Sequence, residues 1–144
     1  MNARDYLQRY GRELQKIVTL EERIRALDDL FSVTQDMTSE RVQSSPKPDK
    51  IGEIIAKKSD LNAELQEEIE ASYDVMNEIE GTINKVPNGR YKLILYGRYI
   101  CFMTWEKIAE SMQRADGAEP YSERWLYILH KRALREVDKI INDV

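Results

Sequence analysis

The sequence is poor in the residues that build disulfide, metal and membrane structures. Its 144 residues include one cysteine, one histidine, six glycines and four prolines. A single thiol cannot form an internal disulfide, and one cysteine with one histidine is too small a set for a zinc site. No stretch approaches the roughly 18 consecutive apolar residues of a membrane helix, and no apolar signal-peptide core follows Met1. We therefore expect a cytoplasmic protein with no membrane partner, in which Cys101 is a small buried residue.

Residue sets that support catalysis are also missing. The sequence has no glycine-rich phosphate loop and no Glu-x-x-His motif of the kind that binds two iron ions. The available nucleophile and base are Cys101 and His130, and Cys101 lies in the apolar run 99–103. We therefore expect no enzymatic activity, no cofactor, and neither catalytic nor metal-binding residues.

Charge is distributed unevenly along the chain. The net charge of −4 argues against a polybasic protein that binds nucleic acid without selectivity. Residues 1–87 hold 12 Lys+Arg against 18 Asp+Glu, whereas residues 88–144 hold 10 against 8. The C-terminal part is thus the less acidic one and the better candidate for contact with phosphates.

Apolar residues at steps of three and four predict two long helices in the N-terminal part of the chain, over residues 3 to about 42 and about 50–85. The loop between them, residues 43–50, holds two prolines and two serines. Two helices of matched length predict an all-α fold that opens with an antiparallel, coiled-coil-like hairpin over residues 1–86. Its apolar stripes are wide, so we expect a second copy of the chain or the C-terminal domain to cover them.

The C-terminal domain, residues 87–144, is predicted to hold three shorter helices, at about 90–102, 104–112 and 122–142. Thr104 and Ser122 are plausible N-caps of the second and third. The apolar positions of the third helix share one face: Leu126, Leu129 and Ala133. The opposite face carries Arg124, Tyr127, Ile128 and Lys131. A helix with this pattern packs on a small domain and presents its other face to a partner.

Several motifs follow one another in this domain. They are Val86-Pro87, Tyr96-Gly97-Arg98-Tyr99, Thr104-Trp105-Glu106-Lys107-Ile108-Ala109-Glu110-Ser111-Met112, Tyr121-Ser122-Glu123 and Leu129-His130-Lys131-Arg132-Ala133-Leu134. In combination they resemble the DNA-binding fourth region of bacterial sigma factors. The resemblance is closer still to small phage and prophage regulators that carry such a region behind a long helix pair. One departure is the connector at 113–121, about seven residues longer than the usual helix-turn-helix link.

The resemblance implies a three-helix domain of helix-turn-helix type and a phage or prophage transcriptional regulator. Helix 122–142 would enter the major groove of double-stranded DNA, with Arg124 contacting a guanine edge. RNA polymerase and a second copy of the chain, as a homodimer or higher oligomer, are further implied partners in a bacterial host. The implied DNA-binding residues are Ser122, Glu123, Arg124, Tyr127, Ile128, Lys131, Arg132, Arg98 and Lys107. Lys131, Arg132, Arg98 and Lys107 would contact phosphates.

Other interpretations remain open. From the residues alone, Arg124 and Lys131 fit solvated charges on a helix exterior, whereas Ile128 among them indicates a contact surface. The chain would also suit a protein-interaction module that binds RNA polymerase or a sigma factor through the helical hairpin. A third alternative is a phage DNA-packaging component such as a small terminase, although that class usually places its DNA-binding domain before the coiled helices.

Overall fold

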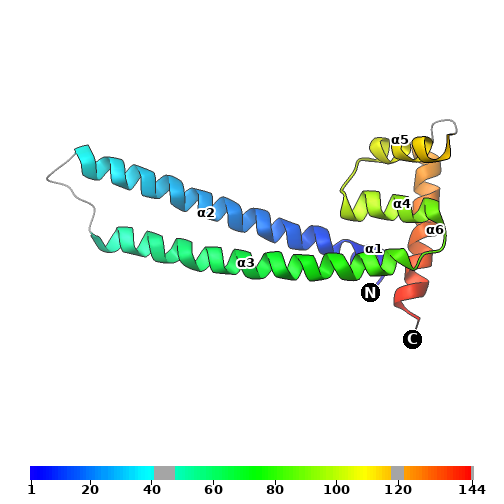
Figure 1. Ribbon diagram of the computed structural model, residues 1–144, viewed down its shortest axis with the longest axis horizontal. Helices are drawn as coiled ribbons and strands as arrows, with labels where there is room; N and C mark the ends of the chain where they lie inside the picture. Colours follow the sequence, from blue (N-terminus) through cyan, green and yellow to red (C-terminus); the bar gives the residue numbers. More distant parts are fainter. Residues whose placement is uncertain (41–47, 118–121, 144) are drawn as a thin grey trace. The chain divides into compact units, whose positions relative to one another are not determined.

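The computed structural model describes residues 1–40, 48–117 and 122–143, and within them it contains helices and no β-strand (Figure 1). The elements are α1 (Ala3–Leu7), α2 (Arg9–Glu40), α3 (Pro48–Asn84), α4 (Gly89–Leu95), the π-helix η1 (Tyr96–Ile100), α5 (Trp105–Asp116) and α6 (Glu123–Ile141). The predicted all-α class is confirmed for this part of the chain. No helix found there joins the length and the apolar character that a membrane crossing requires.

Two predicted loops are shorter than expected. Helix α3 begins at Pro48, so residues 48–50 are helical, because proline at the first position of a helix loses no hydrogen bond. Helix α5 continues to Asp116, and the left-handed Gly117 (φ 64°) caps it by donating its N–H to the Gln113 carbonyl at 2.9 Å. The rest of the two predicted loops, 41–47 and 118–121, lies outside the described residues.

The contacts divide the chain into two compact units. Unit 1 comprises Met1–Arg12 and Tyr73–Val144, and unit 2 comprises Glu13–Ser72. The boundary predicted between residues 86 and 87 therefore falls inside unit 1. That the chain works as two separate functional domains stays a prediction.

Unit 2 is built from the long helices α2 and α3. Leu20 and Leu61 are buried in it, and Lys58 Nζ of α3 lies 2.5 Å from Asp28 Oδ1 of α2. Other apolar side chains of the unit remain exposed, namely Val18, Leu30, Val33, Ile55 and Ile69. Within unit 2, burial therefore covers only part of the apolar surface that the sequence supplies.

Two carboxyl groups meet in unit 2. A hydrogen bond with Glu13 raises the pKa of Glu68, and burial and the negative charge of Glu13 raise it further, whereas Lys16 opposes the shift. Within the described residues, Glu68 Oε1 and the hydroxyl of Ser72 are shielded from solvent without a hydrogen-bond partner. A raised acid pKa means that folding favours the protonated form, so this pair weakens the unit as pH rises past the normal carboxyl range.

We expect Glu68→Gln to stabilise the protein at pH 7 to 8, because the amide donates to Glu13 without requiring a proton. The gain should be about 1–3 °C in Tm, in line with one net hydrogen bond, and should shrink towards pH 4. Circular dichroism melts across this pH range measure it. Glu67→Gln, at the exposed neighbouring position, is the matched control. An equal gain in both variants would show that lower net charge, rather than the pair, is the cause.

In unit 1 the N-terminal residues pack with the C-terminal ones. Its first core cluster joins α1, the end of α3, α4 with η1, and α6. Its buried members are Ala3, Leu7, Ile79, Ile83, Val86, Leu95, Tyr99, Ala133 and Val137. The Ala3 N–H also donates to Asp138 Oδ1 of α6 at 2.7 Å. Helix α1 is therefore a structural part of the C-terminal assembly, which the sequence did not reveal.

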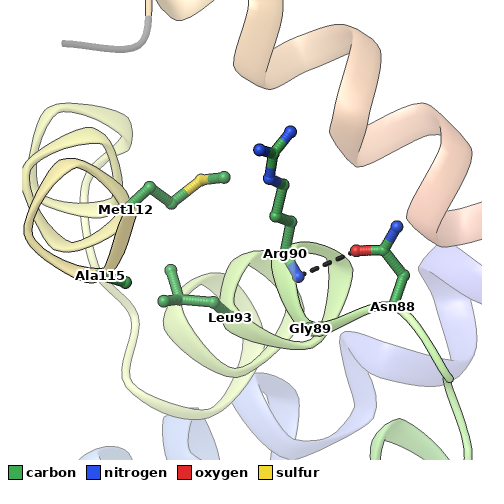
Figure 2. Close-up of a pocket in the computed structure, with 6 residues that line it drawn as sticks. All are labelled: Asn88, Gly89, Arg90, Leu93, Met112 and Ala115. Carbon is green, nitrogen blue, oxygen red and sulfur yellow. Dashed lines mark hydrogen bonds between the residues drawn. The ribbon is translucent and has the colours of Figure 1, made fainter. Parts of the chain in front are cut away.

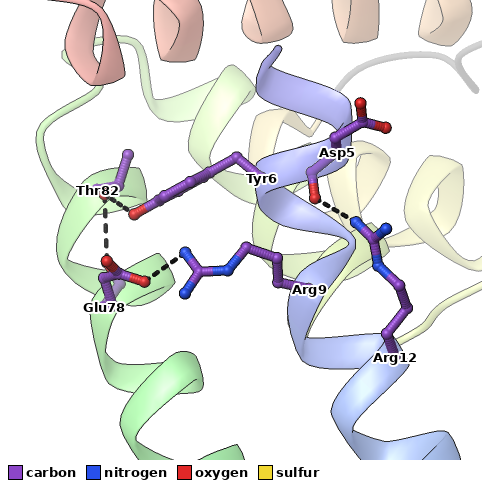
Figure 3. Close-up of polar contacts among 6 residues, drawn as sticks. All are labelled: Asp5, Tyr6, Arg9, Arg12, Glu78 and Thr82. Carbon is purple, nitrogen blue, oxygen red and sulfur yellow. Dashed lines mark hydrogen bonds and ion pairs between the residues drawn. The ribbon is translucent and has the colours of Figure 1, made fainter. Parts of the chain in front are cut away.

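Polar contacts hold the start of the chain against α3 (Figure 3). The Tyr6 hydroxyl lies 2.7 Å from Thr82 Oγ1, and Arg9 Nη1 donates to Glu78 Oε2 at 2.6 Å. These two contacts come from consecutive turns of α1 and α2, so they fix the orientation of α1 as well as its position.

Candidate nucleic-acid interface

The segment predicted as one helix at 90–102 changes character halfway along. After α4 it widens into the π-helix η1, and π-turns of this kind occur frequently at functional sites. Gly97 allows η1 to approach α5, because an added Cβ would lie 3.1 Å from Ile108 Cγ1 and 3.2 Å from Met103 Sδ. Cys101 is exposed, so its predicted burial is wrong: η1 ends at Ile100, and the left-handed Phe102 (φ 53°) turns the chain away.

Helices α5 and α6 pack on α4 through a second apolar cluster, whose buried members are Ile94, Ile108, Met112, Leu126 and Leu129. Both predicted N-caps are confirmed: the Thr104 hydroxyl accepts from Lys107 N, and the Ser122 hydroxyl accepts from Trp125 N, each at 3.2 Å. Ala133, on the same face of α6 as Leu126 and Leu129, belongs to the cluster around α1.

The outer face of α6 carries the side chains expected to read DNA. Arg124, Tyr127, Ile128 and Lys131 are all exposed, with Tyr127 at 44% and Ile128 at 36%. Ser122 and Glu123, at the start of the helix, are exposed as well. Within the described residues, neither Arg124 nor Lys131 takes part in an ion pair. Arg124, Tyr127, Ile128 and Lys131 recur at steps of three and four, so these four share one accessible face of α6, which carries two cations.

The remaining predicted phosphate contacts have partners inside the protein. Arg98 is half-buried, donates to the Met103 carbonyl at 3.0 Å and lies over the Trp105 ring at 4.8 Å. Arg132 lies 5.5 Å from the Trp125 ring centre, and Lys107 Nζ lies 3.8 Å from Glu110 Oε2. Trp125 is itself 37% exposed. These cations are thus held near the surface rather than free.

Aromatic side chains connect η1, α5 and α6. Trp105 makes T-shaped contacts with Tyr127 and His130, with ring centroids 5.1 and 5.0 Å apart. The Tyr99 hydroxyl shares a 2.7 Å hydrogen bond with His130 Nε2. Burial, followed by the positive charges of Arg4 and Arg98, lowers the pKa of His130 to about 4. Burial likewise raises the pKa of Tyr99. The pair is therefore neutral at pH 7.

From the sequence, Tyr99 was noted only as part of a motif, and His130 only as part of a motif and as the available base beside Cys101. The sequence signal for Tyr99 was its place in the motif Tyr96-Gly97-Arg98-Tyr99. No signal pointed to the packing of α1 on α6, because it joins the two ends of the chain.

A cavity of about 480 Å³ lies between α4 and α5 (Figure 2). Its lining among the described residues is Asn88, Gly89, Arg90, Leu93, Met112 and Ala115. Asn88 Oδ1 caps α4 there by accepting from Arg90 N at 2.9 Å. None of the predicted DNA-binding residues belongs to this lining, so the cavity is not part of the proposed interface.

Comparison with protein-family models, with curated proteins and with solved structures finds no match.

Proposed function

We propose that the protein is a DNA-binding transcriptional regulator of phage or prophage origin, in which α5 and α6 form a helix-turn-helix. The observation that carries the proposal is the exposed face of α6, where Arg124, Tyr127, Ile128 and Lys131 lie together. On the opposite face, Leu126 and Leu129 are buried against α4 and α5. A recognition helix needs one packed face and one exposed face, because the packing of the buried face sets how deeply the exposed face enters the groove.

The chemistry of the face suits a major groove. A guanidinium at Arg124 can pair bidentately with guanine, the Ile128 side chain can contact a thymine methyl, and Lys131 can reach a phosphate. Charge separation supports the same conclusion. Unit 1 contains 14 Lys+Arg against 12 Asp+Glu, whereas unit 2 contains 8 against 14. Contact with the DNA polyanion therefore favours unit 1.

Unit 2 would serve oligomerisation. The Asp28–Lys58 pair and the buried Leu20 and Leu61 support an antiparallel hairpin of α2 and α3. The exposed apolar side chains of the unit, including Ile55 and Ile69, offer surface for a second copy of the chain. A dimer would also strengthen binding, because a single small module with few cations holds DNA weakly.

The direct test uses duplexes selected from a random pool by the purified protein. Arg124→Ala should cost about 1–3 kcal/mol of discrimination at one base pair. Lys131→Ala should weaken binding to all sequences and lower the slope of log K against log salt by about 1. Fluorescence anisotropy across a salt series measures both. Arg25→Ala, on α2 in unit 2, removes the same charge as a control. Unchanged affinity in both α6 variants would refute the proposed reading face.

A second candidate function is a protein-interaction module that binds RNA polymerase or a sigma factor. The exposed apolar side chains and acidic balance of unit 2 favour it. This second function predicts that purified RNA polymerase binds the wild-type chain and does not bind a variant with Ile55→Asp and Ile69→Asp. It also predicts that no duplex is selected from the random pool.

A further inference from the structure

The Trp105 ring, at the start of α5, is held by residues of two other elements. The Arg98 guanidinium of η1 lies over this ring, 4.8 Å from its centre, and Arg98 Nη1 donates to the Met103 carbonyl at 3.0 Å. His130 of α6 makes a T-shaped contact with Trp105, with ring centroids 5.0 Å apart. Contacts to η1 and to α6 therefore fix the position of the Trp105 ring.

His130 is a firm support for this ring. Its Nε2 shares a 2.7 Å hydrogen bond with the Tyr99 hydroxyl of η1, and only 7% of the residue is exposed. A buried polar side chain whose hydrogen bond is satisfied makes its surroundings more rigid. The contact with His130 thus restricts the orientations that Trp105 can adopt.

A further contact of Trp105 reaches the proposed reading face. Tyr127, one turn before His130 on α6, makes a T-shaped contact with Trp105, with ring centroids 5.1 Å apart. Tyr127 is 44% exposed, and within the described residues its hydroxyl has no hydrogen-bond partner. The protein therefore holds the Tyr127 ring at Trp105 and leaves the hydroxyl available to a ligand.

Holding a side chain in place before a ligand arrives increases affinity. Each side chain that becomes ordered only on binding costs about two- to tenfold in affinity. A cation over the face of an indole ring stabilises that ring in one orientation, and a second aromatic ring in edge contact with the indole is constrained in turn. Such supporting residues keep a binding side chain in its productive geometry without touching the ligand.

We propose that Arg98 is a positioning residue, which acts through Trp105 to hold Tyr127 where it contacts the DNA duplex, and which makes no phosphate contact of its own. This inference rests on the proposed function. It replaces the phosphate contact that the motif resemblance implied for Arg98. The half-buried guanidinium is already engaged by the Met103 carbonyl and the Trp105 ring.

The test is a double-mutant cycle in the full chain. Fluorescence anisotropy over a salt series measures its affinity for the duplex selected from the random pool. Arg98→Gln should lower affinity about threefold, because it removes the cation from the Trp105 ring, and should leave the slope of log K against log salt unchanged. In a Tyr127→Ala background the same substitution should cost nothing, because the side chain that Arg98 positions is gone. Arg98→Lys should keep most of the affinity, since an ammonium also binds an aromatic face. Arg25→Gln, on α2, matches the loss of charge and should change neither quantity.

Two results would overturn the inference while duplex binding persists. A slope lowered by about 0.9 in Arg98→Gln would show a phosphate contact. An equal loss in the wild-type and Tyr127→Ala backgrounds would show that Arg98 supports only the fold. Unchanged affinity in Arg98→Gln, with a loss in Arg124→Ala, would refute the role of Arg98 and leave the proposed function standing. If neither of these variants nor Lys131→Ala changes binding, the proposed function itself fails.

The free protein provides a readout that does not depend on DNA. The NMR signals of the Tyr127 ring should shift in Arg98→Gln and stay in place in Arg25→Gln, because only the first substitution releases the Trp105 ring. Unshifted Tyr127 signals in Arg98→Gln would contradict a connection through Trp105 and overturn the inference.

Discussion

Leu126→Ala is expected to lower the free energy of unfolding by about 2–5 kcal/mol, because it leaves a cavity in the centre of the second core cluster. Leu126 is fully buried there against α4 and α5. Since α6 takes its orientation from this contact, duplex binding should fall as well. Urea unfolding followed by circular dichroism measures the first effect, and anisotropy with the selected duplex measures the second.

The opposite face of α6 provides the control. Ile128→Ala removes an apolar side chain that is 36% exposed, so its cost in stability should stay under about 0.5 kcal/mol. It should nevertheless weaken DNA binding, because Ile128 lies on the proposed reading face. Similar losses of stability in the two variants would contradict the division of α6 into a packing face and a reading face.

Acid should destabilise unit 1 through His130. Burial, and then the charges of Arg4 and Arg98, lower the pKa of His130 to about 4 from its ordinary 6.5. The folded state thus binds the proton less readily than the unfolded state. The contribution of neutral His130 to the stability of unit 1 is fully present above pH 6.5 and is lost as pH falls towards 4. The free energy of unfolding changes over this range by at most about 1.4 kcal/mol per pH unit.

The variant His130→Gln isolates this contribution from that of the carboxylates. Its amide can replace Nε2 as the partner of the Tyr99 hydroxyl, and it does not titrate. The difference in unfolding free energy between wild type and variant should therefore change between pH 6.5 and 4 and stay constant above pH 7. Parallel curves over the whole range would show that His130 has the same pKa in both states.

The parts of the fold that were predicted correctly depend on neighbours in sequence. Ser122 and Thr104 indicate helix starts, because the hydroxyl of an N-cap residue accepts a hydrogen bond from the backbone N–H three residues later. The two faces of α6 follow from its 3.6-residue period. The end of α5 was also predictable: Gly117 is a C-cap glycine, and placing the helix end at Met112 overlooked it.

The errors arise where contacts between residues far apart in sequence determine the local structure. Helix α1 packs on α6 across 135 positions of sequence, and periodicity contains no information about such a pair. The π-helix η1 does not follow a 3.6-residue period, so Cys101 was predicted to be buried although it is exposed. Gly11 illustrates the same limit. A glycine inside a long helix lowers its stability relative to alanine, yet the Phe102 ring packs on this one, with 3.3 Å from Phe102 Cε1 to an added Cβ.

The bond between Ala3 and Asp138 has a consequence for synthesis in the cell. A growing chain leaves the ribosome N-terminus first, so α1 emerges long before the helix against which it packs. Unit 1 can close only after α6 has left the ribosome, whereas unit 2, formed by the contiguous residues 13–72, can close before α6 is made. During that interval the apolar side of α1 is exposed, because the residues that pack on it in the folded protein have not yet been made.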